Sequence, residues 1–349
     1  MKELQMNDRI VDINQKISVV IPVYNEERFI KSTIDMVLGQ DYPKNLIEIL
    51  VVDGGSDDKT AEIAGNLALK DPRIRVFRNP AKLSSAGRNI GIKNATGNII
   101  TFIDGHTYIG NNQLLRNIVL LMEKEGLSIL SRPQFMNTPH NSFFQKAVSA
   151  ARKSLIGHGL GSTIYNPEDK RVNPMSSGAT YRREVFEKIG LFDEKFDACE
   201  DVELNYRAYK NGYDSFTSMK LAVFYYPRAS VTDLFRQMKR YGMGRLRLAR
   251  KHPETLSLGT LLPFFITLSI PLFAVLSLVL NPLYNPLLFL IGSYLLSICG
   301  WSLVISLREN ITYLFVLPLI YFSIHFGLGW GFLTELIRTI FGKSAIFDK

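Results

Sequence analysis

Two apolar runs in the first third of the chain each end on an aspartate. Residues 47–52 lead into Asp53, and residues 99–103 lead into Asp104-Gly105-His106. A short apolar run that is rich in β-branched residues and is followed by a turn is typical of a buried strand in a parallel sheet. Ligands of open α/β sheets bind just beyond the carboxyl ends of such strands. The sequence therefore predicts an α/β domain with a site for a charged ligand at Asp53, Asp104 and His106.

The first half of the chain alternates apolar runs with amphipathic segments, which favours a doubly wound, mainly parallel sheet. We expect strands at residues 17–23, 46–52, 74–77 and 99–103, and helices at residues 26–38, 57–69, 86–94, 113–125, 142–156, 183–189 and 200–211. Glycines between Gly157 and Pro174 predict a long loop. In a compact domain such a loop is usually a mobile lid or a disordered segment.

The formal net charge of +9 indicates an anionic partner, which could be nucleic acid, lipid headgroups or nucleotide phosphates. Between Arg236 and Lys251 the chain has seven basic residues and no acidic one, directly before an apolar tail. That position favours a cytoplasmic membrane flank, and we expect no nucleic-acid partner. The two cysteines, Cys199 and Cys299, form no zinc-binding pattern and fit a reducing cytoplasm.

Three long apolar segments follow Lys251. Residues 258–280 and 286–307 contain no charged residue, and residues 311–333 contain only His325 as a titratable group. Each exceeds the roughly 20 residues that span a bilayer, so we expect three transmembrane helices. Glycines in the third segment also allow close helix packing or a re-entrant segment. Three full crossings would put Arg338 and Lys343 outside, against the positive-inside tendency, and a re-entrant segment would remove that conflict.

The turn at Asp104-Gly105-His106 suggests a metal site. Residues i and i+2 of an extended segment share a side, so the carboxylate and the imidazole can reach one ion. A carboxylate suits Mg²⁺ or Mn²⁺, and the imidazole favours Mn²⁺. The absent side chain at Gly105 would let phosphate oxygens approach the backbone. The alternative is a simple turn with a solvated His106.

The other strand ends also allow two interpretations. Asn25 can cap a helix whose positive end Glu26 and Glu27 favour. Asp53 lies at the exit of its strand, where a carboxylate can accept hydrogen bonds from a base or a ribose. The chain has no P-loop motif, and no strand is followed by the dinucleotide-binding glycine motif.

An ordered set of motifs resembles the family 2 glycosyltransferases, which have a GT-A fold and use nucleotide-sugars. The motifs are Val-Val-Ile-Pro-Val-Tyr-Asn-Glu at 19–26, Val-Val-Asp-Gly-Gly-Ser-Asp-Asp at 51–58, Ala-Gly-Arg-Asn-Ile-Gly at 86–91 and Phe-Ile-Asp-Gly-His at 102–106. Residues 176–183 and 190–194 are similar to the acceptor-side segment of the family, and residues 199–204 to its Glu-Asp motif. The resemblance covers about residues 17–250. One departure is Asp-x-His in place of the usual Asp-x-Asp.

The resemblance implies a role for each matching residue. Asp201 would be the catalytic base with Glu200 as its neighbour, and the reaction would invert the anomeric centre. Arg88 and Asp104 would face the donor diphosphate, and Asp104 with His106 would hold Mn²⁺ or Mg²⁺. The nucleoside would be held by Pro22, Tyr24, Glu26 and Asp53. The alternative for Glu200 and Asp201 is that they only stabilise the N-terminus of a helix.

A last motif precedes the apolar tail. Gln237, Arg240 and Tyr241 resemble the Gln-x-x-Arg-Trp motif, with Tyr in place of Trp, which in processive synthases binds the acceptor end and the donor diphosphate near the membrane. An apolar stripe at helical spacing beside basic residues also predicts an interfacial amphipathic helix. The stripe consists of Leu234, Met238, Tyr241 and Leu248. The simpler alternative is an electrostatic membrane flank.

Together these features predict three regions: a GT-A domain at 1–228, a basic interface segment at 229–255 and a transmembrane region at 256–340. The chain most resembles the succinoglycan-type exopolysaccharide glucosyltransferases. We expect a multi-pass protein of the inner (cytoplasmic) membrane with its catalytic domain in the cytoplasm. It would transfer a sugar, most plausibly from a UDP-sugar, to a polyprenyl-diphosphate-linked glycan. The alternatives are a polyprenyl-phosphate sugar synthase, a processive polysaccharide synthase and a membrane scaffold with an inactive transferase-like domain.

Overall fold

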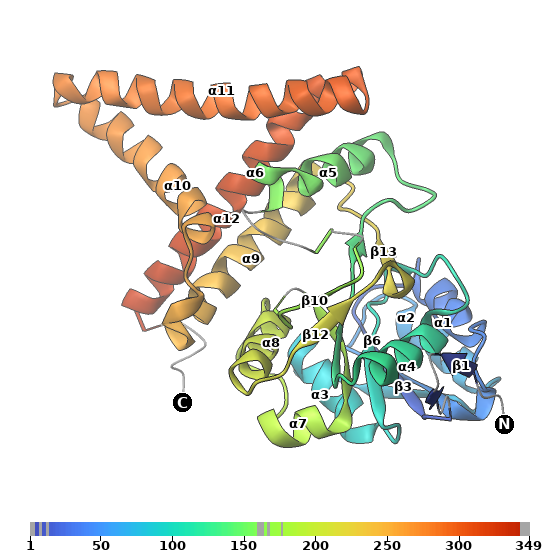
Figure 1. Ribbon diagram of the computed structural model, residues 1–349. Coiled ribbons are helices and arrows are strands. Elements are labelled where there is room, and N and C mark those ends of the chain that lie inside the picture. Colours follow the sequence, from blue (N-terminus) through green and yellow to red (C-terminus); the bar gives the residue numbers. More distant parts are fainter. Residues whose placement is uncertain are drawn as a thin grey trace. The chain divides into compact units, whose positions relative to one another are not determined.

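The computed structural model describes residues 4–6, 9–11, 14–158, 164–165, 168–175 and 177–342. Its contacts divide the chain into two compact units (Figure 1). The first, here the sheet unit, comprises Met1–Thr138 and Thr163–Tyr226, and the second, here the helical unit, comprises Pro139–Ser162 and Pro227–Lys349. This division differs from the predicted region 1–228, because the segment that begins at Pro139 belongs to the helical unit.

The sheet unit is built on a mixed sheet that has eight strands among the described residues. The central strands β6, β3, β4 and β5 are parallel, whereas β11 is antiparallel to both of its neighbours. The spatial order is β10 (Lys170–Val172), β12 (Ser215–Thr217), β8 (Ile129–Ser131), β11 (Gly178–Arg182), β6 (Ile99–Phe102), β3 (Ile17–Val23), β4 (Ile47–Asp53) and β5 (Ile74–Arg78). The four predicted strands are therefore confirmed within one or two residues.

Helices cover both faces of this sheet, as a doubly wound fold requires. Alternate residues of β3 and β4 pack against α1 (Ile30–Leu38), α2 (Thr60–Ala68) and α4 (Leu114–Glu125). The intervening residues pack against α3 (Ser84–Asn94), α7 (Arg183–Ile189) and α8 (Glu200–Lys210). Burial on both faces explains why these strands are continuous apolar runs.

Two smaller sheets complete the unit. Strand β13 (Val223–Tyr225) lies between β7 (Thr107–Tyr108) and β9 (Gln134–Phe135). Its register pairs Tyr225 with Thr107, which places Tyr225 beside the turn that follows β6. The short strands β1 (Leu4–Met6) and β2 (Arg9–Val11) form an antiparallel pair. Single-turn 3-10 helices occur at η1 (Lys44–Leu46) and η2 (Met219–Leu221).

Two predicted helix starts are wrong. Helix α1 begins at Ile30 rather than at residue 26, because the amides of Glu26 and Glu27 donate to side chains of the next loop, Thr60 Oγ1 at 2.7 Å and Asp58 Oδ2 at 3.1 Å. Helix α2 likewise begins at Thr60 rather than at residue 57. The predicted loop at 157–174 contains the unforeseen strand β10, and residues 159–163 and 166–167 of it lie outside the described part.

The helical unit contains α5 (Phe143–Lys153), α6 (Leu155–His158), α9 (Val231–Lys251), α10 (Leu258–Ser277), α11 (Tyr284–Arg308) and α12 (Leu317–Ile340). The single-turn helices η3 (Pro253–Thr255), η4 (Asn281–Leu283) and η5 (Ile311–Phe315) lie between them. The predicted helix at 142–156 is two helices, and Ser142 caps α5 through a capping box with Gln145. Helix α5 buries Ala147, Val148 and Ala151 in one core with α9, α11 and α12.

Helices α10, α11 and α12 are each long and apolar enough to cross a membrane. Helix α9 carries the predicted apolar stripe, of which Leu234, Met238 and Leu248 are buried. Tyr241 does not belong to the stripe, because 37% of it is exposed and Gly242 faces α12 instead. Figure 1 shows α9 running alongside α12.

Candidate active site

Arg88 lies at the centre of the candidate site, on α3. Its Nη2 is 3.4 Å from Asp104 Oδ1, just beyond β6, and its Nη1 is 3.5 Å from Glu200 Oε1, at the start of α8. The guanidinium carbon lies 5.6 Å from the centre of the Phe102 ring and 5.5 Å from that of Phe192. The arginine thus lies against two aromatic rings, which also contact each other, and joins two of the predicted site residues.

The contacts of Arg88 leave part of its guanidinium without a partner. Nε is buried and has no hydrogen-bond partner among the described residues. Burial alone would lower the pKa of Arg88, but the charges of Glu200, Asp104 and Asp201 outweigh burial and raise it. Burial raises the pKa of Glu200, against the opposing effect of the Arg88 charge. The site therefore holds a permanent cation beside a carboxyl group that resists ionisation.

The neighbouring Asp201 is less enclosed than Glu200. Glu200 is buried, whereas Asp201 is partly exposed and accepts a hydrogen bond from the Val202 amide through Oδ1 at 2.8 Å. The charge of Asp201 acts on Arg88 and on Tyr225. The adjacent carboxylates are thus in different environments, and Asp201 is the more accessible of the two.

The turn after β6 is fixed on α1. Thr33 Oγ1 donates to the carbonyl of Gly105 at 2.8 Å. A Cβ at Gly105 would lie 2.8 Å from Val23 Cγ1 and 3.0 Å from Glu26 Cγ. The expectation that Gly105 lets phosphate oxygens approach the backbone is therefore wrong. Val23 and Glu26 fill the space of the missing side chain, which leaves no room for a phosphate.

His106 and Asp104 have different partners. His106 Nδ1 is 2.7 Å from Glu26 Oε1, while Asp104 faces Arg88. Among the described residues, no three His, Cys, Asp or Glu side chains lie close enough to hold a metal ion by themselves. A metal-binding histidine usually gives its second ring nitrogen to a carboxylate, as His106 does with Glu26. Asp104 and His106 supply donor types that suit Mn²⁺ or Mg²⁺, and a shared ion at the two residues stays a prediction.

Asp53 is occupied by its own turn. Its carboxylate accepts hydrogen bonds from the Gly55 amide at 3.0 Å, the Ser56 amide at 3.2 Å and Ser56 Oγ at 2.6 Å. The residue is buried. It therefore shapes the loop beyond β4, and any contact with a nucleoside would come in addition to this role.

Asn25 connects the two loops that follow β3 and β4. Its side-chain Oδ1 accepts a hydrogen bond from the Asp57 backbone amide at 2.9 Å. Its backbone amide donates to Ser56 Oγ, also at 2.9 Å. The backbone of Asn25 is left-handed with φ of 55°, and Asn adopts this conformation more readily than most residues. The helix-cap role expected for Asn25 is wrong, since Phe29 precedes the first residue of α1.

The predicted nucleoside residues lie around these loops. Tyr24 is 47% exposed, and its hydroxyl donates to Asp57 Oδ2 at 3.3 Å. Pro22, on β3, faces Gly87 of α3, where an added Cβ would lie 3.5 Å from the Cβ of Pro22. An exposed aromatic ring beside a tight strand–helix contact provides a surface on which a base could stack.

Two residues of the site were missed by the sequence analysis. Arg132 is buried directly after β8, where it donates to the Phe102 carbonyl and to Thr101 Oγ1, both at 2.7 Å. Burial lowers the pKa of Arg132, although Tyr225 and Asp104 act in the opposite direction. Burial and the charge of Asp104 raise the pKa of Tyr225. A signal for Arg132 was present, since an arginine directly after an apolar run requires buried acceptors.

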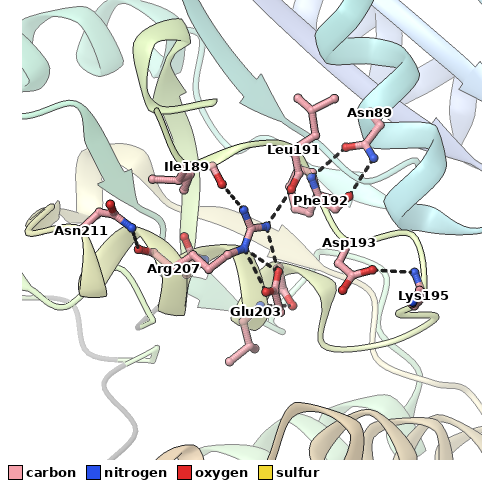
Figure 2. A network of polar contacts seen from close by, with 12 residues as sticks. Asn89, Ile189, Leu191, Phe192, Asp193, Lys195, Glu203, Arg207 and Asn211 are labelled. Atoms are coloured by element: carbon pink, nitrogen blue, oxygen red, sulfur yellow. Dashed lines mark hydrogen bonds and ion pairs between the residues drawn. The ribbon is translucent and has the colours of Figure 1, made fainter. Parts of the chain in front are cut away.

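A network of polar contacts supports the wall of the site (Figure 2). Arg207 of α8 donates to both carboxylate oxygens of Glu203, at 2.8–3.0 Å, and to the carbonyls of Ile189 and Leu191. Asn89, next to Arg88 on α3, exchanges hydrogen bonds with the backbone of Phe192 in both directions at 2.9 Å. Asn89 thereby holds Phe192, whose ring lies against Arg88.

The predicted motif on α9 belongs to the helical unit. Gln237 Nε2 lies 3.4 Å from Tyr241 Oη, and both Arg240 and Tyr241 are exposed. Gln237, Arg240 and Tyr241 thus lie close together on the exposed side of α9. Their relation to the sheet-unit site remains a prediction.

Comparisons with known proteins place the chain in a family. A family model described as "Glycosyl transferase family 2" matches residues 18–190. The succinoglycan biosynthesis protein ExoA of Rhizobium meliloti (strain 1021) is 33% identical over 247 residues, which cover 70% of this chain and 73% of the relative. A second relative, from Methanococcus voltae, is 27% identical over 326 residues, which cover 92% of this chain and 97% of the relative. Its name is dolichyl N-acetyl-alpha-D-glucosaminyl phosphate 3-beta-D-2,3-diacetamido-2,3-dideoxy-beta-D-glucuronosyltransferase.

The fold is also similar to that of a solved structure, the mannosyltransferase PcManGT from Pyrobaculum calidifontis in complex with GDP-Man and Mn²⁺. The TM-score is 0.55 at 17% identity, over 96% of this chain and 92% of that chain. The GT-A-like fold expected from the motifs is therefore confirmed. With the family model and the similarity to ExoA, we conclude that the chain is a glycosyltransferase and belongs to glycosyltransferase family 2.

Proposed function

We propose that the chain is an inverting, metal-dependent glycosyltransferase that transfers a sugar from a nucleotide-sugar, in particular a UDP-sugar, to a lipid-linked glycan at the membrane. The observation that carries this proposal is the position of Arg88, within 3.4 Å of Asp104 and 3.5 Å of Glu200. One cation thereby connects the predicted donor side of the site to the predicted acceptor side.

In the proposed reaction, Asp201 takes the proton from the acceptor hydroxyl as that oxygen attacks the anomeric carbon. Its partial exposure suits this role better than the burial of Glu200. The bond to the diphosphate breaks on the opposite face, so the configuration at the anomeric carbon inverts. Arg88, whose positive charge is permanent, stabilises the negative charge that develops on the leaving group.

The remaining donor contacts follow from the same arrangement. Asp104 and His106 would hold Mn²⁺ or Mg²⁺, and Glu26 would orient the His106 ring. A divalent cation at this place would supply further charge stabilisation for the diphosphate. Tyr24 and Pro22 would contact the nucleoside, with Glu26 and Asp53 shaping that end of the site.

A lipid-linked acceptor is supported by two observations. The described part of the chain has three helices apolar enough to span a membrane, preceded by the basic residues of α9. A relative similar over 92% of this chain carries the name of an enzyme that acts on a dolichyl phosphate-linked sugar. We further propose that the acceptor is a polyprenyl-diphosphate-linked glycan, used in exopolysaccharide or surface glycan synthesis. The protein would lie in the cytoplasmic membrane with its sheet unit in the cytoplasm, on the side of the basic residues.

The test is a transfer assay with purified enzyme in detergent. Nucleoside diphosphate release is measured for UDP-, GDP- and dTDP-sugars, each with polyprenyl-diphosphate-linked glycan, with polyprenyl phosphate or with no acceptor. We expect a UDP-sugar to release nucleoside diphosphate only in the presence of the lipid-linked glycan. Excess chelator should stop this release, and added Mn²⁺ or Mg²⁺ should restore it. Transfer to polyprenyl phosphate would instead support a polyprenyl-phosphate sugar synthase. Repeated addition of sugars to one acceptor would support a processive synthase. If no donor releases nucleoside diphosphate, the chain would be an inactive scaffold.

The assignment of the base has its own variant. Asp201→Asn should lower turnover by about 10²–10⁴-fold, the usual contribution of a general base, while nucleotide-sugar binding measured by calorimetry stays unchanged. Asp214→Asn, at an exposed position after α8, is the matched control. Near-normal turnover of the Asp201 variant would contradict the assignment.

A further inference from the structure

The three apolar helices differ in how much of each is covered by protein. Only 17% of the most apolar window is buried in α10 and in α11, against 50% in α12. Helices α10 and α11 expose leucine and phenylalanine side chains along their length, as helices in contact with lipid do. Much of α12 instead contacts other helices of its unit. The three segments are therefore not equivalent, and α12 is also the least apolar, with a mean hydropathy of 1.3 against 2.0 for each of the other two.

The main neighbour of α12 is α9, and the two helices run parallel and side by side. Near the start of α9, Val231 and Phe235 line a groove with Leu319 and Phe322 of α12. At the other end, Arg250 Nη1 donates to Thr339 Oγ1 at 2.6 Å. The contact thus extends over about 20 residues of each helix, or about 30 Å at the rise of an α-helix.

Glycines bring the two backbones into direct contact. A Cβ at Gly242 of α9 would lie 2.0 Å from the carbonyl oxygen of Leu328. A Cβ at Gly331 of α12 would lie 2.0 Å from that of Lys239. Because no side chain fits at either glycine, α9 and α12 form one closely packed pair in which neither helix can turn independently of the other.

The charges of α9 determine where this pair can lie. Basic residues occur from the first to the last third of the helix and are exposed or half-buried, except for the buried Arg247. They are Arg236, Lys239, Arg240, Arg245, Arg247, Arg250 and Lys251. Each arginine or lysine at the centre of a bilayer costs about 2.5–3.5 kcal/mol on insertion scales. Helix α9 therefore cannot cross the bilayer, and its full-length contact with α12 argues against a perpendicular crossing by α12, although Gly329 of α12 also packs closely on Pro263 and Thr267 of α10.

An acidic group inside α12 points to the same conclusion. Glu335 is completely buried and lies 2.9 Å from Arg247, whose side chain is 4% exposed. This carboxylate follows the charge-free part of the third apolar segment and forms an ion pair with an arginine of α9. A charge that is neutralised by α9 keeps α12 at the depth of α9.

Charges around the other two apolar helices fit a simple hairpin. The connection at residues 278–283, between α10 and α11, carries no charge. Lys251 precedes α10, and Arg308 ends α11. Basic residues favour the cytoplasmic side, so both outer ends of the hairpin belong on one side. Only if α12 does not cross is Arg338 on that side too.

We propose that α12 lies along the membrane surface as the partner of α9, so that the α10–α11 hairpin is the part of the described chain that crosses the bilayer. One side of α12 exposes apolar residues at helical spacing, which would contact the lipid. They are Leu319, Phe322, Trp330, Ile337 and Ile340. Tryptophan prefers the membrane–water interface, whereas in a spanning α12 it would lie near mid-membrane. This inference depends on the membrane location proposed above.

The test is the sidedness of single cysteines. In a Cys299→Ala parent, whose remaining Cys199 is buried, Leu256→Cys marks the start of α10, Leu280→Cys the hairpin turn and Ile340→Cys the end of α12. All three positions are exposed. Sealed membrane vesicles of known orientation are treated with an impermeant maleimide and then lysed. A second, detectable maleimide labels the cysteines that the first reagent did not reach, so a cysteine on the outer side loses this label. A cleavable epitope tag after Lys349 reports the same side by protease digestion.

We expect the maleimide to block Leu256→Cys and Ile340→Cys from one side of the membrane, and the protease to cleave the tag from that same side. Leu280→Cys should be blocked from the other side. Reaction of Ile340→Cys and cleavage of the tag from the side of Leu280→Cys would overturn the proposal. If Ile340→Cys is shielded by lipid on both sides, cleavage of the tag decides. Extraction of the whole protein from the membrane by alkaline carbonate would instead contradict the membrane location, which separates the two failures.

Discussion

Helix α8 carries two glutamates, Glu200 and Glu203, that pair with arginines in opposite ways. Glu203 is fully buried and receives three hydrogen bonds from Arg207, whose other donors reach backbone carbonyls. Glu200 contacts Arg88 once, at 3.5 Å, and the buried Arg88 Nε has no hydrogen-bond partner in the part of the chain that the structure describes. Arg207 thus uses most of its donors within the protein, whereas Arg88 keeps a buried donor without a partner among the described residues.

The difference separates a structural pair from a functional one. An arginine that uses most of its donors within the protein has little left to offer a ligand, so we expect Arg207 to act mainly on stability. An unsaturated arginine in a buried site is costly unless a ligand completes its contacts. The two pairs should therefore respond to mutation in opposite ways, one in stability and the other in turnover.

The largest effect is expected for Arg207→Leu. Removing this guanidinium leaves the buried Glu203 without its partner, which typically costs about 3–5 kcal/mol of unfolding free energy. Thermal unfolding in detergent measures the loss, and turnover per folded molecule should remain near that of the wild type. Lys210→Ala, at an exposed position of the same helix, is the control. A loss of turnover without a loss of stability would refute the comparison.

The converse variant is Arg88→Lys, which keeps the charge but removes the planar fork. We expect kcat/KM to fall by about 10²–10³-fold, as when one charge-stabilising donor is removed. The unfolding temperature should change much less than in Arg207→Leu. The matching Arg207→Lys variant should show the reverse pattern. Equal losses of activity in the two lysine variants would remove the distinction between the pairs.

The smallest effect concerns pH. Because burial raises the pKa of Glu200, its carboxyl ionises at higher pH in the folded than in the unfolded state. The stability of the wild type relative to Glu200→Gln should therefore fall as pH rises above the ordinary glutamate pKa, and should level off above the raised one. Unfolding temperatures across this range, with the exposed Glu187→Gln as control, measure the difference. A wild type that gains stability with pH relative to Glu200→Gln would show that Arg88 dominates instead.

The sheet was predictable because its central strands are buried on both faces, which makes each one a continuous apolar run. Helix starts were less predictable. Asn25 and Glu26 have the composition of a helix N-terminus, but their hydrogen bonds go to the loop after β4. Such contacts join residues more than 30 positions apart in the sequence. Local patterns carry no information about them.

The site shows the same limit. The motifs identified Arg88, Asp104 and Glu200, which the structure brings together. They did not indicate that Glu26 would bind His106, or that Arg132 would lie under the end of β6. In α9, Gly242 packs against α12 and Tyr241 does not, and this outcome depends on a helix about 90 residues later in the sequence. Pairing partners that are distant in sequence decided each of these cases.

The two loops joined by Asn25 also affect the energetics of ligand binding. Two separate loops would each lose conformational entropy when a nucleotide ordered them, and that loss would weaken affinity. Here Asn25 links the loop after β3 to Ser56 and Asp57 of the loop after β4. The ordering is therefore completed during folding, so a nucleotide that binds here, as proposed above, would meet a preorganised surface. Asn25 can raise affinity in this way without touching the ligand.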